Sequence, residues 1–138
     1  MEAARSRKIF VNLAVEDLKR SVEFFTDLGF TFDPKFTDDK ATCMIVSDEA
    51  FVMLLERDRF KDFTSKELSD PATSTEAILA FSAESRHEVD ALYECAIASG
   101  GKPANEPQDY GFMYSQSFQD PDGHLWEVMW MDPKGLES

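Results

Sequence analysis

The chain has 138 residues and a net charge of −13, with 27 acidic against 14 basic side chains. This balance excludes a general nucleic-acid binder, which needs a basic surface to displace counterions from phosphate, and it excludes docking to anionic membranes by charge. The length predicts one domain, residues 1–138, that buries a real core without disulfides or metal. No apolar run is long enough for a signal peptide or a membrane span, which predicts a cytoplasmic protein whose Cys43 and Cys95 are thiols.

The first half of the chain predicts a strand, a helix and three further strands. Residues 9–15 are apolar and partly β-branched, as expected of a buried strand. Asp17 is a candidate N-cap for a helix that ends at Gly29, where a left-handed residue is favoured. The remaining strands are predicted at residues 31–36, 42–46 and 51–56, with polar turns between them.

The second half repeats this order. Residues 77–83 form a predicted strand, and Ser85 with Glu88 forms a capping box that opens a helix ending at Gly100. A short strand is expected near Lys102, and two longer strands at residues 112–119 and 125–131. The repeat predicts two βαβββ modules, 8–56 and 76–131. The linker or flap between them, 57–75, is long for a compact domain and is expected to hold a helical turn.

Two sequence segments carry a resemblance to a known family. Residues 12–30, from Asn12 to Phe30, are similar to the first strand and helix of the vicinal oxygen chelate superfamily. Asp120-Pro121-Asp122-Gly123, with the residues to Glu127, resembles its DPDG turn and last strand. This superfamily includes glyoxalase I, extradiol dioxygenases, fosfomycin-resistance enzymes and bleomycin-binding proteins. The resemblance implies an α+β fold in which two paired βαβββ modules form a half-open barrel with the site inside it, and it implies a homodimer.

The resemblance also implies where a divalent metal would be held in the metal enzymes of this superfamily. The ligand positions fall on Phe10, near Met53, near Ile78 and on Glu127. Only Glu127 offers a donor that a hard or borderline metal accepts. A shift of the alignment adds at most Glu76 to the possible ligands. We therefore expect no metal and no cofactor, and we do not favour a metal held through Glu127. The histidines, His87 and His124, are expected to have structural or surface roles.

Strand alternation outlines a cavity, because side chains along a strand point to opposite faces in turn. If Phe10 and Glu127 face inward, the predicted ligand-binding set also includes Asn12, Phe51, Met53, Ile78 and Ser82. Tyr114 joins this set if its face is inward, and the sequence leaves the faces of Tyr114 and Gln116 open. The loop from Pro103 to Asp109 is a candidate rim or lid. The alternative is that this face is filled core.

The predicted function is binding of a small organic molecule, without turnover, in an apolar, aromatic-lined barrel cavity. The alternative is a lyase, isomerase or dioxygenase-type enzyme that uses Glu127 as a general base or as the lone protein ligand of a metal. Glu127 can also be hydrogen-bonded scaffold, so enzymatic activity stays open. A purely structural or interaction module is less favoured because the inner face keeps polar groups. The expected partners are a small-molecule ligand and a second copy of the chain, with no nucleic acid and no membrane.

Overall fold

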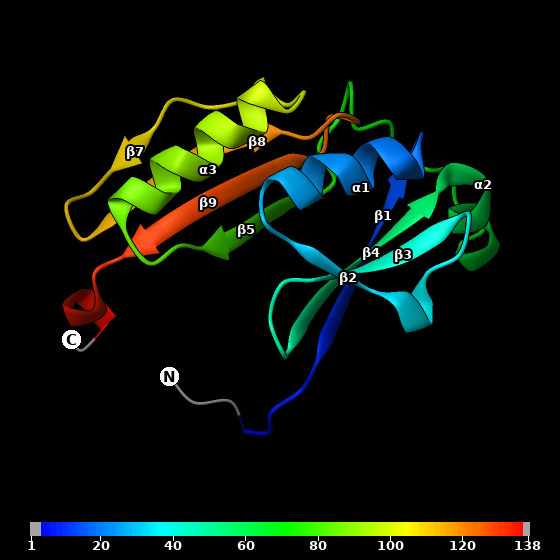
Figure 1. Cartoon of the computed structure of the whole chain (residues 1–138), viewed down its shortest axis with the longest axis horizontal. Helices are drawn as coiled ribbons and strands as arrows, with labels where there is room; N and C mark the ends of the chain where they lie inside the picture. The colour runs from blue at the N-terminus through cyan, green and yellow to red at the C-terminus, as the bar shows by residue number, and fades with distance from the viewer. Residues whose placement is uncertain (1–3, 137–138) are drawn as a thin grey trace. The chain divides into compact units, whose positions relative to one another are not determined.

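The computed structural model describes residues 4–136, and the chain divides into two compact units. Unit 1 is Met1–Leu68 and unit 2 is Ser69–Ser138. Each unit contains a mixed β-sheet and a long helix, so the predicted α+β fold with two βαβββ-type sheets is confirmed (Figure 1). The predicted modules, 8–56 and 76–131, lie one in each unit. Within residues 4–136, no helix has the length and apolar character needed to cross a membrane.

Unit 1 follows the predicted order. The helix α1 begins after Asp17, whose side chain accepts the Arg20 N–H at 3.3 Å, and it ends before Gly29, which has a φ of 98°. In the sheet, ordered β1-β4-β3-β2, β1 runs parallel to β4 and the other pairs are antiparallel. The bounds are β1 Ile9–Val15, α1 Leu18–Asp27, β2 Thr31–Asp33, β3 Ala41–Ile45 and β4 Ala50–Glu56.

The core of unit 1 contains aromatic side chains from α1 and aliphatic side chains from the central strands. Phe24 and Phe25 are each 1% exposed, and their rings meet edge to face with centroids 4.9 Å apart. Leu54 and Met44 are completely buried on the sheet. The Glu56 carboxylate at the end of β4 accepts the Leu18 N–H at 3.1 Å, which fixes the start of α1 to the sheet.

The predicted strand at residues 31–36 is wrong in its second half. β2 ends at Asp33, and residues Pro34–Phe36 form a 3₁₀ turn. Pro34 cannot donate a ladder hydrogen bond, and the Asp33 carboxylate accepts the Lys35 N–H at 2.9 Å, which favours the turn over the strand. The linker after β4 does contain the expected helical turns, α2 at Arg57–Phe60 and a 3₁₀ turn at Lys61–Phe63.

Unit 2 has its own sheet, ordered β5-β9-β8-β6, with β7 paired to β8. β5 runs parallel to β9, and α3 contacts β8 and β9. The capping box at α3 forms with a shift: Ser85 accepts the Glu88 N–H, but the Glu88 carboxylate accepts from Glu84 rather than Ser85. The bounds are β5 Ile78–Ser82, α3 Arg86–Ala98, β6 Lys102–Pro103, β7 Gln108–Asp109, β8 Met113–Gln119 and β9 Leu125–Met131.

The DPDG turn between β8 and β9 is organised by the buried Asp120 carboxylate. Its Oδ1 accepts the backbone N–H groups of Asp122, Gly123 and His124 at 3.0, 3.1 and 3.0 Å. Its Oδ2 accepts the indole Nε1–H of Trp126 at 2.9 Å. Burial raises the pKa of Asp120, and the nearby His124 and the Trp126 N–H act in the opposite direction. The first Asp of this family-like motif therefore has a structural role.

Arg86 at the start of α3 fixes β7 and the turn that follows it. Its guanidinium donates to both carboxylate oxygens of Asp109, at 2.8 and 2.9 Å, and to the Gly111 carbonyl at 2.9 Å. The same group lies 5.1 Å from the ring centroids of Tyr114 and Trp130. This arrangement combines a bidentate ion pair with cation–π contacts and holds the loop that sequence reasoning assigned to a rim or lid.

The Arg86–Asp109 pair predicts a specific pH dependence of stability. Hydrogen bonding by Arg86 lowers the pKa of Asp109 from 3.8 to about 2. A lowered pKa stabilises the folded state above the unfolded-state value, and this contribution is lost as the pH falls from about 4 to about 2. The stability of the wild type should therefore fall more steeply over this window than that of Asp109→Asn. Urea unfolding across the window measures this, with the exposed Asp48→Asn as the control; parallel curves would contradict the prediction.

Candidate functional site

In unit 1, the sheet brings the predicted ligand-binding residues together. Phe10 and Asn12 on β1 are in register with Phe51 and Met53 on β4. Because partners in register point to the same side of a sheet, all of these side chains share one face. Leu13 and Leu54 are likewise partners, on the opposite face, and are buried. The alternation used to predict this part of the set is therefore present in the structure.

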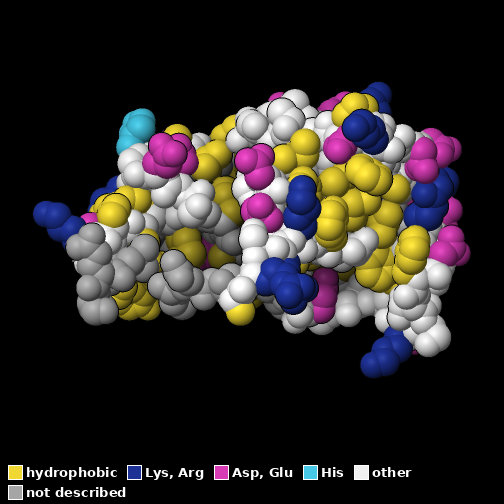
Figure 2. Space-filling view, turned by 90° about the horizontal axis from the view of Figure 1, so that it is seen from below, with side chains coloured by type: hydrophobic (Ala, Val, Ile, Leu, Met, Phe, Trp, Pro, Cys, Tyr) yellow, Lys and Arg dark blue, Asp and Glu magenta, His cyan; other side chains and the backbone are white. Residues whose placement is uncertain are grey.

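A stacked pair of rings, Phe10 and Phe51, lies on this face at the second position of β1 and of β4, and is here called the aromatic platform. Their centroids are 5.0 Å apart and their planes differ by 14°. Phe10 is nevertheless 51% exposed, and the Lys8 ammonium lies 5.6 Å from the Phe51 ring centroid. Viewed from below, hydrophobic side chains gather on the part of the surface that unit 1 provides, with Lys and Arg side chains at their border (Figure 2). The alternative that this face is filled core therefore does not hold for Phe10, because its side chain is exposed.

In unit 2, Glu127 lies at the centre of one face of the sheet. It pairs with Ala80 on β5 and with Ser117 on β8, and the partner pairs Ile78–Leu125 and Ser82–Met129 place their side chains on the same face. Glu127 is half-buried. Within residues 4–136 its carboxylate has neither a hydrogen-bond nor an ion-pair partner. The hydroxyl of its strand partner Ser117 donates instead to the Asn105 carbonyl at 3.5 Å. The hydrogen-bonded scaffold role considered for Glu127 has no support in this geometry.

Tyr114 does not share the face of Glu127. It pairs with Trp130, and its hydroxyl donates to Asp90 of α3 at 2.6 Å. The Gln116 amide donates to the same Asp90 oxygen at 2.6 Å, and the hydrogen bond to Asp90 raises the pKa of Tyr114. These side chains therefore lie on the helix-covered face, and Tyr114 leaves the candidate ligand-binding set. The sequence could not assign this face because the segment is polar on both sides.

The donor set does not suit a divalent metal. Of the side chains at the ligand positions that the resemblance implies, only Glu127 carries a donor. Glu76, the nearest alternative, lies 3.3 Å from Nδ1 of His124, which is 4% exposed and so has the structural role expected of it. Over the described part of the chain, no group of at least three His, Cys, Asp or Glu side chains could hold a metal ion. We therefore derive no chemistry through a metal.

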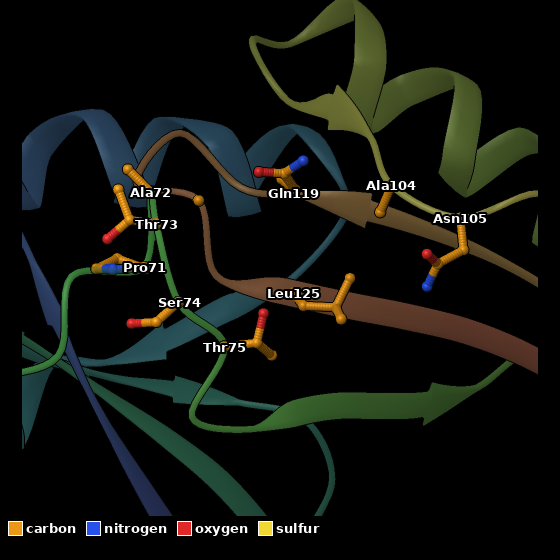
Figure 3. Close-up of a pocket in the computed structure, with 10 residues that line it drawn as sticks. Pro71, Ala72, Thr73, Ser74, Thr75, Ala104, Asn105, Gln119 and Leu125 are labelled. Atoms are coloured by element: carbon orange, nitrogen blue, oxygen red, sulfur yellow. The ribbon is translucent and has the colours of Figure 1, made fainter.

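Sequence reasoning missed a polar groove in unit 2, with a volume of about 270 Å³ (Figure 3). It is bounded by the segment from Pro71 to Thr75, by Ala104 and Asn105, and by Gln119, Gly123 and Leu125. The signal in the sequence was the run of hydroxyl side chains Thr73-Ser74-Thr75, which was assigned only to the linker. A groove of this kind depends on the packing of a loop against the sheet, which local sequence patterns do not determine.

Sequence and structure comparisons agree on the class of this protein. The profile described as Glyoxalase/Bleomycin resistance protein/Dioxygenase superfamily matches residues 9–128. The structure is similar to hypothetical protein SA1046 from S. aureus, with 25% identity, coverage of 88% of this chain and 91% of that chain, and a TM-score of 0.76. It is also similar to a glyoxalase-related enzyme from Fulvimarina pelagi, with 20% identity, coverages of 91% and 88%, and a TM-score of 0.76.

A further similar structure is the fosfomycin resistance protein FosX from Listeria monocytogenes, with 20% identity, coverages of 97% and 98%, and a TM-score of 0.64. No curated protein matches the chain. The fold is thus that of the glyoxalase-type α+β proteins. The chain belongs to the Glyoxalase/Bleomycin resistance protein/Dioxygenase superfamily, which confirms the resemblance inferred from the motifs at its two ends.

Proposed function

We propose that this protein binds a small, largely apolar organic molecule against the aromatic platform and does not turn it over. The observation that carries this proposal is that Phe10 stays 51% exposed while its ring stacks at 5.0 Å on Phe51. An exposed planar surface of this kind gains free energy when a flat apolar ligand covers it. The exposed Asn12 on the same face offers the few polar contacts that orient a ligand in such sites.

The proposal also includes the partner and location that the sequence predicted, a homodimer in the cytoplasm. A ligand held by apolar contact and one amide needs no metal, which fits a chain whose implied ligand positions carry Phe, Met and Ile. The match to FosX supports only the fold, because the identity is 20%.

The test is a titration with the neutral fluorescent probe 1-N-phenylnaphthylamine, with and without a chelator. We expect saturable binding at a micromolar dissociation constant, unchanged by the chelator, and competition by flat apolar compounds. Mass spectrometry of the natively purified protein would identify a ligand that copurifies. Absence of saturable binding, or binding that the chelator abolishes, would overturn the proposal.

A second candidate function rests on Glu127. Its half-buried carboxylate has no partner within residues 4–136, as a general base awaiting a substrate proton would. The corresponding activity is of the lyase, isomerase or dioxygenase type, and proton abstraction beside a carbonyl is the step that Glu127 could perform alone.

Glu127→Gln is expected to reduce any such turnover by about a hundredfold or more, because the amide cannot accept the proton. The measurement is turnover of the hemithioacetal of methylglyoxal and glutathione, followed optically, and the exposed Glu106→Gln serves as the matched control. An activity that survives in Glu127→Gln unchanged would remove Glu127 from the catalytic role. No turnover of this hemithioacetal by the wild type would exclude this reaction for Glu127.

A further inference from the structure

The groove in unit 2 is built from polar groups that carry no charge. The groove is lined by the hydroxyl-bearing residues Thr73, Ser74 and Thr75 and by the amide-bearing residues Asn105 and Gln119. In Figure 3 the segment from Pro71 to Thr75 lies to one side of Leu125, with Ala104 and Asn105 to the other. Hydroxyl and amide groups can both donate and accept hydrogen bonds, and Leu125 adds an apolar surface.

Several of these groups remain available to a ligand. Within residues 4–136, the Thr75 hydroxyl and the Asn105 side-chain amide have no hydrogen-bond partner. The Gln119 amide donates to the Pro103 carbonyl at 3.3 Å, so its Oε1 can still accept. The hydroxyls of Ser74 and Thr73 donate to the Asp70 carbonyl, which leaves their oxygens as acceptors. The groove thus presents both donors and acceptors.

The loop wall of the groove is fixed in place. Asp70 accepts backbone N–H groups from Ala72, Thr73 and Ser74. A Cβ on Gly123, whose φ is 104°, would lie 2.8 Å from the Pro71 carbonyl oxygen, so only glycine lets the loop approach the DPDG turn this closely. The Glu76–His124 contact closes the other end of the loop. A preformed wall lowers the entropic cost of binding.

The lining and size of the groove define the class of ligand. Among the residues that the structure describes, no acidic or basic side chain lines the groove, so neither a cation nor an anion finds a countercharge there. The net charge of −13 further disfavours anions. Its hydroxyl and amide lining disfavours a purely apolar molecule. A volume of about 270 Å³ lies just below the usual range for drug-sized ligands. From these properties we propose that the groove binds a small neutral polyol, such as a monosaccharide or a cyclitol, at a site separate from the aromatic platform.

The test uses the ¹⁵N-labelled full chain and amide chemical-shift changes. The probes are D-glucose and myo-inositol, with sodium acetate and tetramethylammonium chloride as charged controls. We expect saturable, millimolar binding of a polyol, with shifts concentrated at Thr75, Asn105 and Gln119, including the side-chain amides, and no saturation by the charged probes. Binding of acetate or tetramethylammonium at the same residues would overturn the polyol assignment.

Three variants test the groove and distinguish it from the aromatic platform. Thr75→Val removes a hydroxyl with little change of shape, and Asn105→Leu removes the amide. Each should weaken polyol binding about fivefold or more, as expected for loss of a hydrogen bond. Phe10→Ala should bind the polyol like the wild type, so failure of the proposed function and failure of this site are distinguishable. The proposal would be overturned if Thr75→Val bound the polyol with wild-type affinity, or if the chemical-shift changes lay outside the groove. It would also be overturned if these residues were covered by self-association of the chain.

Discussion

Replacing Asp120 with alanine is expected to lower the free energy of unfolding by about 3 kcal/mol. The carboxylate is 3% exposed and accepts N–H groups from Asp122, Gly123, His124 and the Trp126 indole. Alanine removes the carboxylate that accepts the buried indole N–H, and it releases the turn that joins β8 to β9. Some of the loss is offset, because a buried carboxylate is itself costly to desolvate and the turn amides near the surface can reach water.

Urea unfolding followed by tryptophan fluorescence measures this loss. Asp120→Asn keeps one acceptor oxygen and should lie between the wild type and the alanine variant. The control is Asp48→Ala in the exposed turn of unit 1, for which we expect a change below about 0.5 kcal/mol. A loss below about 1 kcal/mol in Asp120→Ala would show that the turn holds without its carboxylate.

Replacing Phe10 with alanine should weaken binding of the 1-N-phenylnaphthylamine probe by about 10- to 100-fold. This factor corresponds to the free energy gained when a ligand covers one aromatic ring. The same change should alter the free energy of unfolding only modestly, since half of the ring is already exposed in the folded chain. This small effect on stability distinguishes Phe10 from a core phenylalanine. Replacing the buried Phe24 with alanine would instead lower the free energy of unfolding by about 3–5 kcal/mol.

The paired variant Phe51→Ala and the double variant complete the test. Because the rings stack on one another, either single change disrupts the stacked pair, and the double variant should bind little more weakly than each single variant. Phe63→Ala, at a 73% exposed position outside the platform, is the control and should bind like the wild type. Full additivity, or equal losses in the control, would show that the probe binds elsewhere.

The sequence was sufficient for the features that depend on local patterns. The caps at Asp17 and Ser85, the glycine stop at Gly29 and the duplicated strand–helix order all follow from backbone preferences and hydrophobic periodicity, and the structure contains them. Alternation along β1 and β4 was likewise sufficient to place Phe10 and Phe51 on one face, because a strand has a fixed period of two. The family could be inferred from the same segments.

Only the tertiary structure determined the features that depend on segments distant in the chain. Tyr114 lies under α3 because Asp90, 24 positions earlier, accepts its hydroxyl, and no local pattern encodes that pairing. The polar groove exists because the loop from Pro71 to Thr75 packs on Gly123. Asp120, read from the sequence as part of a turn, is also the acceptor for a buried indole. Buried polar groups must form hydrogen bonds, and the packing of whole helices and strands determines which of these groups meet.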